Sequence, residues 1–597
     1  MSLDQHPAPR RGLAAFAPGI DAFRTYQASW LSKDIVAGLI LTALLVPQGM
    51  AYAELAGLPV ITGLYTSILC LLGYAVFGPS KILVLGPDSA LGTMIAATIA
   101  PLMLADGDPA RAVMLASMLA LIVGGVMALA GIARLGFVAD LLSKPTQIGY
   151  MNGLALTILV GQLPKLFGFS VDADGLIDEA KAFVQGVSNG DTVTAALAIG
   201  VTSLILIIAL QRWMPKLPAV LIAVVTAIVA VTVFDLVARG VSVVGTLPQG
   251  FPPFDIPRVS AGDFVALIPG ALGIALVALV DTISTSSAFA ARTGQRVRGN
   301  QEMIGIGAAN VAAGFFQGFP VSTSGSRTAV AEQAGMKTQM AGLVGAAAIT
   351  LILLFVPGLL KNLPQPALAA VVIAASLSLA DVPGTMTLFR RRRAEFALSI
   401  SAFLAVAFLG VLPGIGIAVA LSILNVFRRT WWPYQAILGH VEGIPGFHDV
   451  HSYPEAELLE GVVIFRFDAP LIFANARTFR EQVQEIAEDD PTLKWIIVAA
   501  EPITDVDTTA ADMLHDVDEW LNARGTSLVI AEMKDPVRSK IDRYELTKTI
   551  DPAHFFPTIR AATKAFQDET GAEWRTPSAQ PSVPDTRGSR RTERPGG

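Results

Sequence analysis

A long succession of apolar runs is the feature that most constrains how this chain can fold. From about residue 34 to residue 430 the sequence consists of apolar runs separated by short polar or glycine-containing connections. A bilayer core about 30 Å thick needs about 20 apolar residues per helical span. Only 15% of the residues are charged, well below the level of an ordinary soluble domain. The sequence therefore predicts an α-helical membrane protein and excludes a soluble enzyme of this whole length.

The bilayer criterion predicts about fourteen spans, and an even number leaves both chain ends on the same side of the membrane. The predicted spans are residues 35–53, 58–78, 87–103, 111–132, 138–164, 192–211, 217–236, 263–290, 302–317, 323–337, 340–359, 365–380, 396–411 and 413–430. We predict a transporter domain over residues 34–432, preceded by a cytoplasmic segment at residues 1–33. That segment lacks the continuous apolar core of a cleavable signal peptide.

Lysine and arginine are distributed unevenly between the two sets of connections. If the N-terminus lies inside, the cytoplasmic connections hold most of these residues, for example the four arginines at 390–393. The connection at 167–190, on the opposite side, is acidic. Short cytoplasmic loops collect positive charge. We therefore expect an inner (plasma) membrane protein with both termini and the C-terminal domain in the cytoplasm.

Two short segments broken by glycine and proline occupy corresponding places in the two halves of the membrane part. They are VLGPDSALG (84–92) and GFPVSTSGSRTAV (318–330), and each opens a short predicted span. Transporters built from inverted repeats bring such interrupted helices together at the membrane midplane. This spacing predicts seven spans followed by seven inverted spans. The alternative is that many packed helices contain glycine and proline without forming repeats.

The helix starts in these two segments are candidates for an anion site. A helix that begins inside a membrane leaves unpaired N–H groups and the positive end of its dipole at the centre. Ser89 at one start and Ser326 at the other can cap the helix or donate a hydroxyl, and Arg327 adds a permanent charge. A buried arginine is costly in a bilayer and is therefore a functional candidate. The alternative is a structural arginine paired to Asp88.

Two further predicted spans carry polar groups. In VPQGMAY, Gln48 can donate to an anion and Tyr52 lies one turn later, although a glutamine buried for helix packing is the alternative. In ALVALVDTISTSS, Asp281 and Thr285 lie on one helical face. Their oxygens suit a hard cation such as sodium, and a desolvated aspartate can instead carry a proton. The alternative is an aspartate satisfied by neighbouring helix ends.

Several motifs together resemble the SulP anion permeases. They are DIVAGLILTALLVPQGMAYAELAGLPVITGLY, LGPDSA, LSKPTQIGYMNGLALTILVGQLPKLFG and FPVSTSGSRTAVAEQAGMKTQMAG, and the resemblance runs from about residue 30 to 565. It implies the seven-plus-seven inverted-repeat fold, with a core domain of spans 1–4 and 8–11 and a gate domain of spans 5–7 and 12–14. It also implies a homodimer and an elevator-like displacement of the core against the gate.

The resemblance also assigns roles to individual residues. Gln48 and Tyr52 match the family's anion-site positions in the first span, and Ser326 and Arg327 match its Ser-Arg pair. Asp281 falls where many members have an acid.

Members similar to sodium-dependent bicarbonate transporters pair this acid with a hydroxyl four residues later, which Thr285 supplies here. Asp88 departs from the pattern, since many members have a small or aromatic residue there. This acid would cap its helix but repel an anion unless it is protonated, rotated away or paired with Arg327.

Residues 436–570 read as a soluble α/β domain. Strands are predicted at 461–469, 494–500 and 526–532 and amphipathic helices at 474–488 and 508–524. With TDVDTTAADML (504–514), this pattern resembles a STAS domain. Thr509 lies where related anti-sigma-factor antagonists carry a phosphorylatable serine, and a plain helix N-cap is the alternative for this loop. Residues 571–597 are expected to be a disordered tail.

The expected function is secondary active transport of an inorganic oxyanion, with sulfate first, coupled to protons or sodium. A sodium-dependent bicarbonate transporter is the alternative, and a channel-like or anion-exchanging member without cation coupling is an alternative of another class. No enzyme is expected, because the soluble part has no nucleophile–base pair or metal cluster. No cofactor is expected beyond the coupling ion. The expected partners are a small inorganic anion, the lipid bilayer and a second copy, and a net charge of -6 argues against nucleic acid.

Overall fold

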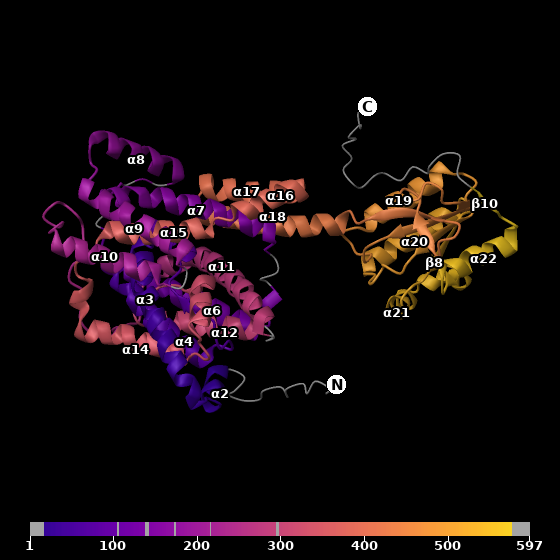
Figure 1. The fold of residues 1–597 in the computed structure, drawn as a ribbon. Helices are drawn as coiled ribbons and strands as arrows, with labels where there is room; N and C mark the ends of the chain where they lie inside the picture. Colours follow the sequence, from indigo (N-terminus) through magenta and orange to yellow (C-terminus); the bar gives the residue numbers. More distant parts are fainter. Residues whose placement is uncertain are drawn as a thin grey trace. The chain divides into compact units, whose positions relative to one another are not determined.

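The computed structural model describes residues 17–575, apart from 104–106, 138–141, 172, 174, 215–216 and 294–297. The chain divides into two compact units, Met1–Ile423 and Leu424–Gly597, which are described separately (Figure 1).

The first unit is almost entirely helical. Its helices are α2 (Pro18–Arg24), α3 (Leu31–Leu55), α4 (Ile61–Phe77), α5 (Ser89–Ile99), α6 (Pro109–Ile132), α7 (Lys144–Phe167), α8 (Leu176–Asn189), α9 (Thr194–Trp213), α10 (Ala219–Val233), α11 (Ala261–Thr293), α12 (Gly299–Gly314), α13 (Gly325–Gln333), α14 (Met340–Phe355), α15 (Gln365–Leu379), α16 (Val382–Arg391), α17 (Arg393–Leu409) and the greater part of α18 (Val411–Trp431). Every predicted span overlaps one of them. Helices α2, α8 and α16 were not predicted, because they are too short and too polar for the bilayer criterion.

Length and hydropathy separate these helices into two kinds. Among the described residues, six helices are long and apolar enough to cross a membrane, at Ala28–Leu55, Pro109–Ile132, Thr194–Trp213, Ala261–Phe289, Gln365–Arg391 and Val411–Arg428. Shorter apolar helices lie at Ile61–Phe77, Ser89–Leu102, Ala219–Val233 and Met340–Phe355. A helix too short for the bilayer must be surrounded by protein, and most residues of α4 and α5 are indeed buried.

The two broken segments meet in a short sheet. Strand β1 (Leu85–Gly86) pairs antiparallel with β2 (Ser322–Thr323), and each strand leads directly into its short helix, α5 or α13. The pairing continues where the Ser324 N–H donates to the Val84 carbonyl over 3.1 Å. The buried Asn310 of α12 supports β2, because its side chain accepts from the Val321 N–H at 2.9 Å. The two broken segments, which the sequence places at corresponding positions of the two halves, are thus in direct contact in the structure.

Close backbone approach joins several helix pairs. A Cβ atom at Gly63 of α4 would lie 1.9 Å from the carbonyl oxygen of Gly49 of α3. A Cβ atom at Gly149 of α7 would lie 2.0 Å from the carbonyl oxygen of Ser399 of α17. Small residues permit such crossings, which pack membrane helices by van der Waals contact. Any larger residue at either glycine would force the two backbones apart.

The contacts form two groups of helices. Helices α3, α4, α6, α12 and α14 pack on one another, with α5 and α11 beside α6, whereas α7, α9, α10, α15, α16 and α17 form a second set. Helix α3 also contacts α10 and α15 of the second set.

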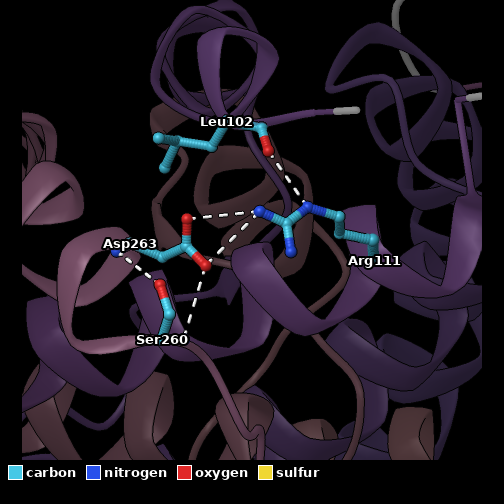
Figure 2. Close-up of polar contacts among 4 residues, drawn as sticks. All are labelled: Leu102, Arg111, Ser260 and Asp263. Atoms are coloured by element: carbon cyan, nitrogen blue, oxygen red, sulfur yellow. Dashed lines mark hydrogen bonds and ion pairs between the residues drawn. The ribbon is translucent and has the colours of Figure 1, made fainter. Parts of the chain in front are cut away.

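An ion pair near the start of α6 ties together three parts of the first group (Figure 2). Arg111 donates from Nη2 to the Asp263 carboxylate at 3.2 Å and from Nε to the Leu102 carbonyl at 3.0 Å. The Asp263 N–H in turn donates to the Ser260 hydroxyl at 3.0 Å. The end of the α5 segment and the starts of α6 and α11 are therefore held by one guanidinium.

The second unit is an α/β fold built on a six-stranded sheet. Its strands are β3 (Gln435–His440), β4 (Phe447–Asp449), β5 (Leu458–Leu459), β6 (Val462–Phe467), β7 (Trp495–Ala499), β8 (Ser527–Ala531), β9 (Phe555–Phe556) and β10 (Trp574–Arg575), and its helices are α19 (Ala476–Asp489), α20 (Thr508–Asn522), α21 (Asp535–Arg543) and α22 (Ile559–Thr570). The strand order is β4-β3-β6-β7-β8-β9, with β3 antiparallel to its neighbours and β6 to β9 parallel. The predicted mixed sheet, strands and helices are confirmed.

Alternation along the strands gives this sheet two apolar faces. Phe465, Ile496 and Ile530 pack under α19 and α20, whereas Ile464 and Val529 pack under α22. Successive strand residues point to opposite faces, so both faces need a helix.

The first part of the range predicted to be a disordered tail contains a strand. Trp574 and Arg575 form β10, which pairs with β5, although both lie in the range 571–597. Residues 576–597 lie outside the described residues.

Candidate anion site

The two short helices begin with different caps. Asp88 is the N-cap of α5, and its Oδ1 accepts the Ala90 N–H at 2.9 Å. Ser324 is the N-cap of α13, and its hydroxyl accepts the Arg327 N–H at 3.4 Å. Ser89, predicted as a possible cap, is instead the buried first residue of α5. Each cap satisfies one of the N–H groups left open at a helix start.

Arg327 lies at the crossing of the two segments and is only 2% exposed. Its Nη1 donates to the Pro87 carbonyl at 2.6 Å. Its Nε and Nη2 have no hydrogen-bond partner among the described residues. Buried donors on a charged group are costly when left unpaired. This side chain therefore has donors available for an acceptor that the described residues do not supply.

The Arg327 guanidinium packs against Gly86 of β1. A Cβ atom at Gly86 would lie 3.4 Å from both Cζ and Nη2 of Arg327, and 2.9 Å from Leu45 of α3. A Cβ atom at Gly86 would therefore be in ordinary contact with the guanidinium and too close only to the Leu45 side chain. Within the part of the chain that the structure describes, Arg327 forms no ion pair within 4 Å, so the alternative of a direct Asp88–Arg327 salt bridge is wrong in this structure. The backbone of one broken segment holds the arginine of the other.

Helix α3 brings Gln48 and Tyr52 toward this crossing. Tyr52 is buried. It lies close enough to Arg327 and Asp88 to interact with their charges, and close enough to Ser89 for a hydrogen bond. Gln48 is partly buried, and its Oε1 has no hydrogen-bond partner among the described residues. Helix α3 contacts both α5 and α13. The predicted residues of the first span are therefore on a helix that touches both helix starts.

Ser326 differs from the buried members of the set. Its side chain is exposed, and its hydroxyl lies 3.1 Å from that of Ser324. Arg327, the next residue, is buried. The first turn of α13 therefore has an exposed hydroxyl at Ser326 and a buried guanidinium at Arg327.

Asp281 and Thr285 lie on α11, beside the start of α13. Both are partly buried, and Asp281 is within electrostatic reach of Asp88. The Thr285 hydroxyl would lie 3.7 Å from a Cβ atom at Gly325, the first residue of α13. The neighbouring Thr282 accepts a hydrogen bond from the Thr323 hydroxyl at 3.1 Å.

The described residues contain no group of three or more His, Cys, Asp or Glu side chains that could hold a metal ion. A sodium ion near Asp281 and Thr285 would therefore need carbonyl or water oxygens as well.

Tyr150 was missed by sequence reasoning. It is a fully buried residue of α7, its hydroxyl has no partner among the described residues, and it is within electrostatic reach of Asp88 and Asp281. It lies in the motif KPTQIGYMNG, where a single tyrosine in an apolar run gave the sequence no distinct signal. Helix α7 thereby supplies a polar group from the second set of helices.

In the second unit, two aspartates hold the loop before α20 in place. Asp507 is the N-cap of α20 and accepts from Ala510 N–H at 2.8 Å, and Asp505 pairs with Lys540. The hydrogen bond from Lys540 is the main reason that the pKa of Asp505 is lowered. Thr508 and Thr509 are exposed in the first turn of the helix. The capping role thus belongs to Asp507, and Thr509 remains accessible.

Two interrupted helices that meet around an incompletely paired arginine define the membrane unit as a transporter of the broken-helix class. The model of the sulfate permease family matches residues 31–402, and the STAS domain model matches residues 453–562. The chain belongs to the sulfate permease family and is a multi-pass membrane transporter, not an enzyme. Both resemblances drawn from the sequence are confirmed.

Relatives of known description cover almost the whole chain. A "probable sulfate transporter" of Mycobacterium tuberculosis is 42% identical over 560 residues, which are 94% of this chain and 99% of the relative. Sulfate transporter 1.3 of Arabidopsis thaliana is 30% identical over 579 residues, which are 92% of this chain and 87% of the relative.

Solved structures share the fold. The murine solute carrier 26 family member A9 anion transporter, in an inward-facing state, has a TM-score of 0.86 at 24% identity and matches 95% of this chain and 96% of its own. The transmembrane domain of the cyanobacterial bicarbonate transporter BicA has a TM-score of 0.57 at 20% identity and matches 67% of this chain and 98% of its own.

Proposed function

We propose that this protein is a secondary transporter of inorganic oxyanions and that sulfate is its substrate. The observation that carries the proposal is Arg327, a buried guanidinium with two nitrogens unpaired among the described residues, at the crossing of two helix starts. A planar fork of donors suits two oxygens of a tetrahedral dianion. The names of the bacterial and plant relatives support sulfate over other oxyanions.

In this proposal five side chains contact the anion: Gln48, Tyr52, Ser89, Ser326 and Arg327. Arg327 supplies the charge, and the helix starts supply partial positive charge and N–H donors. Tyr52 and Ser89 are both buried, and their hydroxyls are close enough for a hydrogen bond, which supports a shared role. The Gln48 amide contributes a neutral donor that would not hold the anion too tightly.

Cation coupling is assigned to Asp281, with Asp88 as a modulator. Moving a dianion next to two carboxylates is unfavourable unless a cation or proton compensates for their charge. Thr285, one helical turn from Asp281, lies next to the start of α13, and Asp88, the cap of α5, is close enough to Asp281 for the two charges to interact. A proton on Asp281, taken up with the anion, would couple sulfate entry to a proton gradient.

Sodium-coupled bicarbonate transport is the second candidate. It is favoured by Thr285, whose hydroxyl lies next to the start of α13 and one helical turn from Asp281. A carboxylate and a hydroxyl oxygen are two of the ligands that sodium would need.

Alternating access is proposed to move one group of helices against the other. The core would contain α3–α6 and α11–α14 and carry the anion, and the gate would contain α7, α9, α10 and α15–α18. Lys165 of α7 and Glu54 of α3 form an ion pair of 3.1 Å across this boundary. Displacement of the core along the gate must break this pair. The same proposal includes the domain bounds, with the transporter domain at residues 34–432 and the STAS domain at 436–570. It also includes a homodimer in the inner membrane with both termini in the cytoplasm.

Uptake into proteoliposomes tests the proposal. We expect the full chain to accumulate labelled sulfate when a proton gradient is imposed, and Arg327→Ala to abolish this accumulation. Accumulation of bicarbonate but not of sulfate, driven by sodium, would instead support the second candidate. Equal equilibration of anions with neither gradient driving accumulation would contradict both and favour a channel-like protein.

A further inference from the structure

Helices α9 and α10 enclose a groove of about 710 Å³, away from the Arg327 crossing. Its lining is made almost entirely of small or apolar side chains, including Ala198, Thr202 and Ala227, and Arg239 lines it as well. No residue of the proposed anion site contributes to it. The groove is therefore a separate feature of the membrane unit.

The length of the groove corresponds to one leaflet. On the α9 side its lining runs from Val193 to Leu206, which at 1.5 Å per residue is about 20 Å of helix. Half of a bilayer core is about 15 Å. Phe234 and Arg239 follow the end of α10, and Val193 precedes the start of α9, so these residues mark the same end. A groove of this length can hold an acyl chain that extends from one edge of the hydrocarbon layer to its middle.

The surface of α9 faces the membrane. Only Ala196, Gly200, Ser203 and Ile207 of this helix are buried, and these form one stripe. Helix α9 is also among those long and apolar enough to cross a bilayer. Ala198 and Thr202 lie on the exposed side of this helix and line the groove. Hydrocarbon can therefore reach the groove from the bilayer.

Arg239 determines which kind of molecule fits. It is exposed at the edge of the groove and forms no ion pair within the described part of the chain, although Asp235 is close in sequence. Phe234 at the same end is 62% exposed, as expected of an aromatic side chain at the membrane interface. A guanidinium at this level binds a phosphodiester through parallel N–H donors. An apolar transmembrane helix from another protein would not carry a negative charge to pair with Arg239.

We propose that the α9–α10 groove binds one acyl chain of an anionic phospholipid whose phosphate pairs with Arg239. The apolar lining receives the chain along one leaflet, and Arg239 selects the headgroup by charge. Because α9 and α10 contact each other and α15, the bound lipid anchors this set of helices to the bilayer.

Native mass spectrometry of the purified full chain tests the headgroup contact. With phosphatidylglycerol and phosphatidylcholine of equal chain length, we expect the wild type to retain phosphatidylglycerol preferentially. Arg239→Gln should reduce this preference about fivefold, the effect of one basic residue at a membrane surface. Arg258→Gln is the matched control, since Arg258 is exposed but does not line the groove, and it should retain the preference. An unchanged preference in Arg239→Gln would overturn the headgroup assignment.

A second variant tests the groove itself. Ala198→Phe places a large ring in the lining at an exposed position, so it should reduce retention of both lipids while the protein stays monodisperse. Ile205→Phe is the control, because Ile205 is exposed on the same helix but outside the lining. Unchanged lipid retention in Ala198→Phe would overturn the proposal. A change of oligomeric mass with unchanged lipid would also overturn it and identify a second copy as the occupant.

Discussion

The starts of α5 and α13 are paired through two short strands, yet their chemistry is opposite. The α5 start is capped by a carboxylate, Asp88, whereas the α13 start is capped by a hydroxyl, Ser324, and carries Arg327 in its first turn. The backbone geometry is shared, so the difference in charge comes from side chains alone. In the proposed anion site, the α13 start would attract the anion and the α5 start would repel it, and single substitutions at either start would change this balance.

Removing the charge of the α13 side should have the largest effect. We expect Arg327→Ala to lower sulfate uptake about 100-fold, because hydrogen bonds to a charged group are lost together with the charge. Arg327→Lys should restore only part of the activity, since an ammonium lacks the planar fork. Initial rates in proteoliposomes measure both variants, with membrane insertion checked in parallel. Unchanged saturation kinetics in Arg327→Ala would remove this residue from the site.

Neutralising the acid beside α13 should abolish coupling rather than binding. In Asp281→Asn we expect gradient-driven accumulation to fall to the level measured without a gradient, because an amide neither carries a proton nor balances sodium. Accumulation under imposed proton and sodium gradients measures this. Thr285→Val should matter only if sodium is the coupling ion. Wild-type accumulation in Asp281→Asn would contradict the coupling role.

Placing an acid at both starts should weaken binding more moderately. Ser324→Asp keeps a strong N-cap but adds a negative charge one turn from Arg327. We expect sulfate affinity to fall about tenfold, as a single added charge near a partly buried site would produce. Calorimetry on the purified full chain gives the affinity, and Ser324→Asn serves as the uncharged control. Equal affinities for the two variants would show that charge at this cap does not reach the anion.

Making the two starts alike should have the smallest effect and the opposite sign. Asp88→Ser retains a capping oxygen and removes the negative charge, so we expect sulfate to bind about fivefold more tightly at neutral pH. The same calorimetric titration measures it. Weaker binding in Asp88→Ser would mean that the carboxylate assists the anion site, for example by orienting Tyr52.

Sequence patterns predicted the membrane helices, the mixed sheet and the two broken segments, because each rests on local composition or periodicity. The contact of Arg327 with the Pro87 carbonyl was not predictable, since a backbone acceptor leaves no trace in residue identity. Tyr150 was overlooked for a related reason. One hydroxyl in an apolar helix resembles ordinary packing until its lack of a partner is visible. Of the two residues predicted as possible caps of α5, Asp88 is the cap and Ser89 is not.

The β1–β2 pairing has a consequence for the thermodynamics of anion binding. Its hydrogen bonds run between backbone groups at Leu85–Thr323 and Gly86–Ser322, so the two helix starts keep their spacing without help from a ligand. In the proposed function, an anion at the crossing would not have to order the groups that receive it, so little conformational entropy would be lost on binding. A site that is already ordered holds its ion more tightly than one that the ion must order. In the proposed cycle, release must therefore come from movement of the core and not from loosening of the two helix starts.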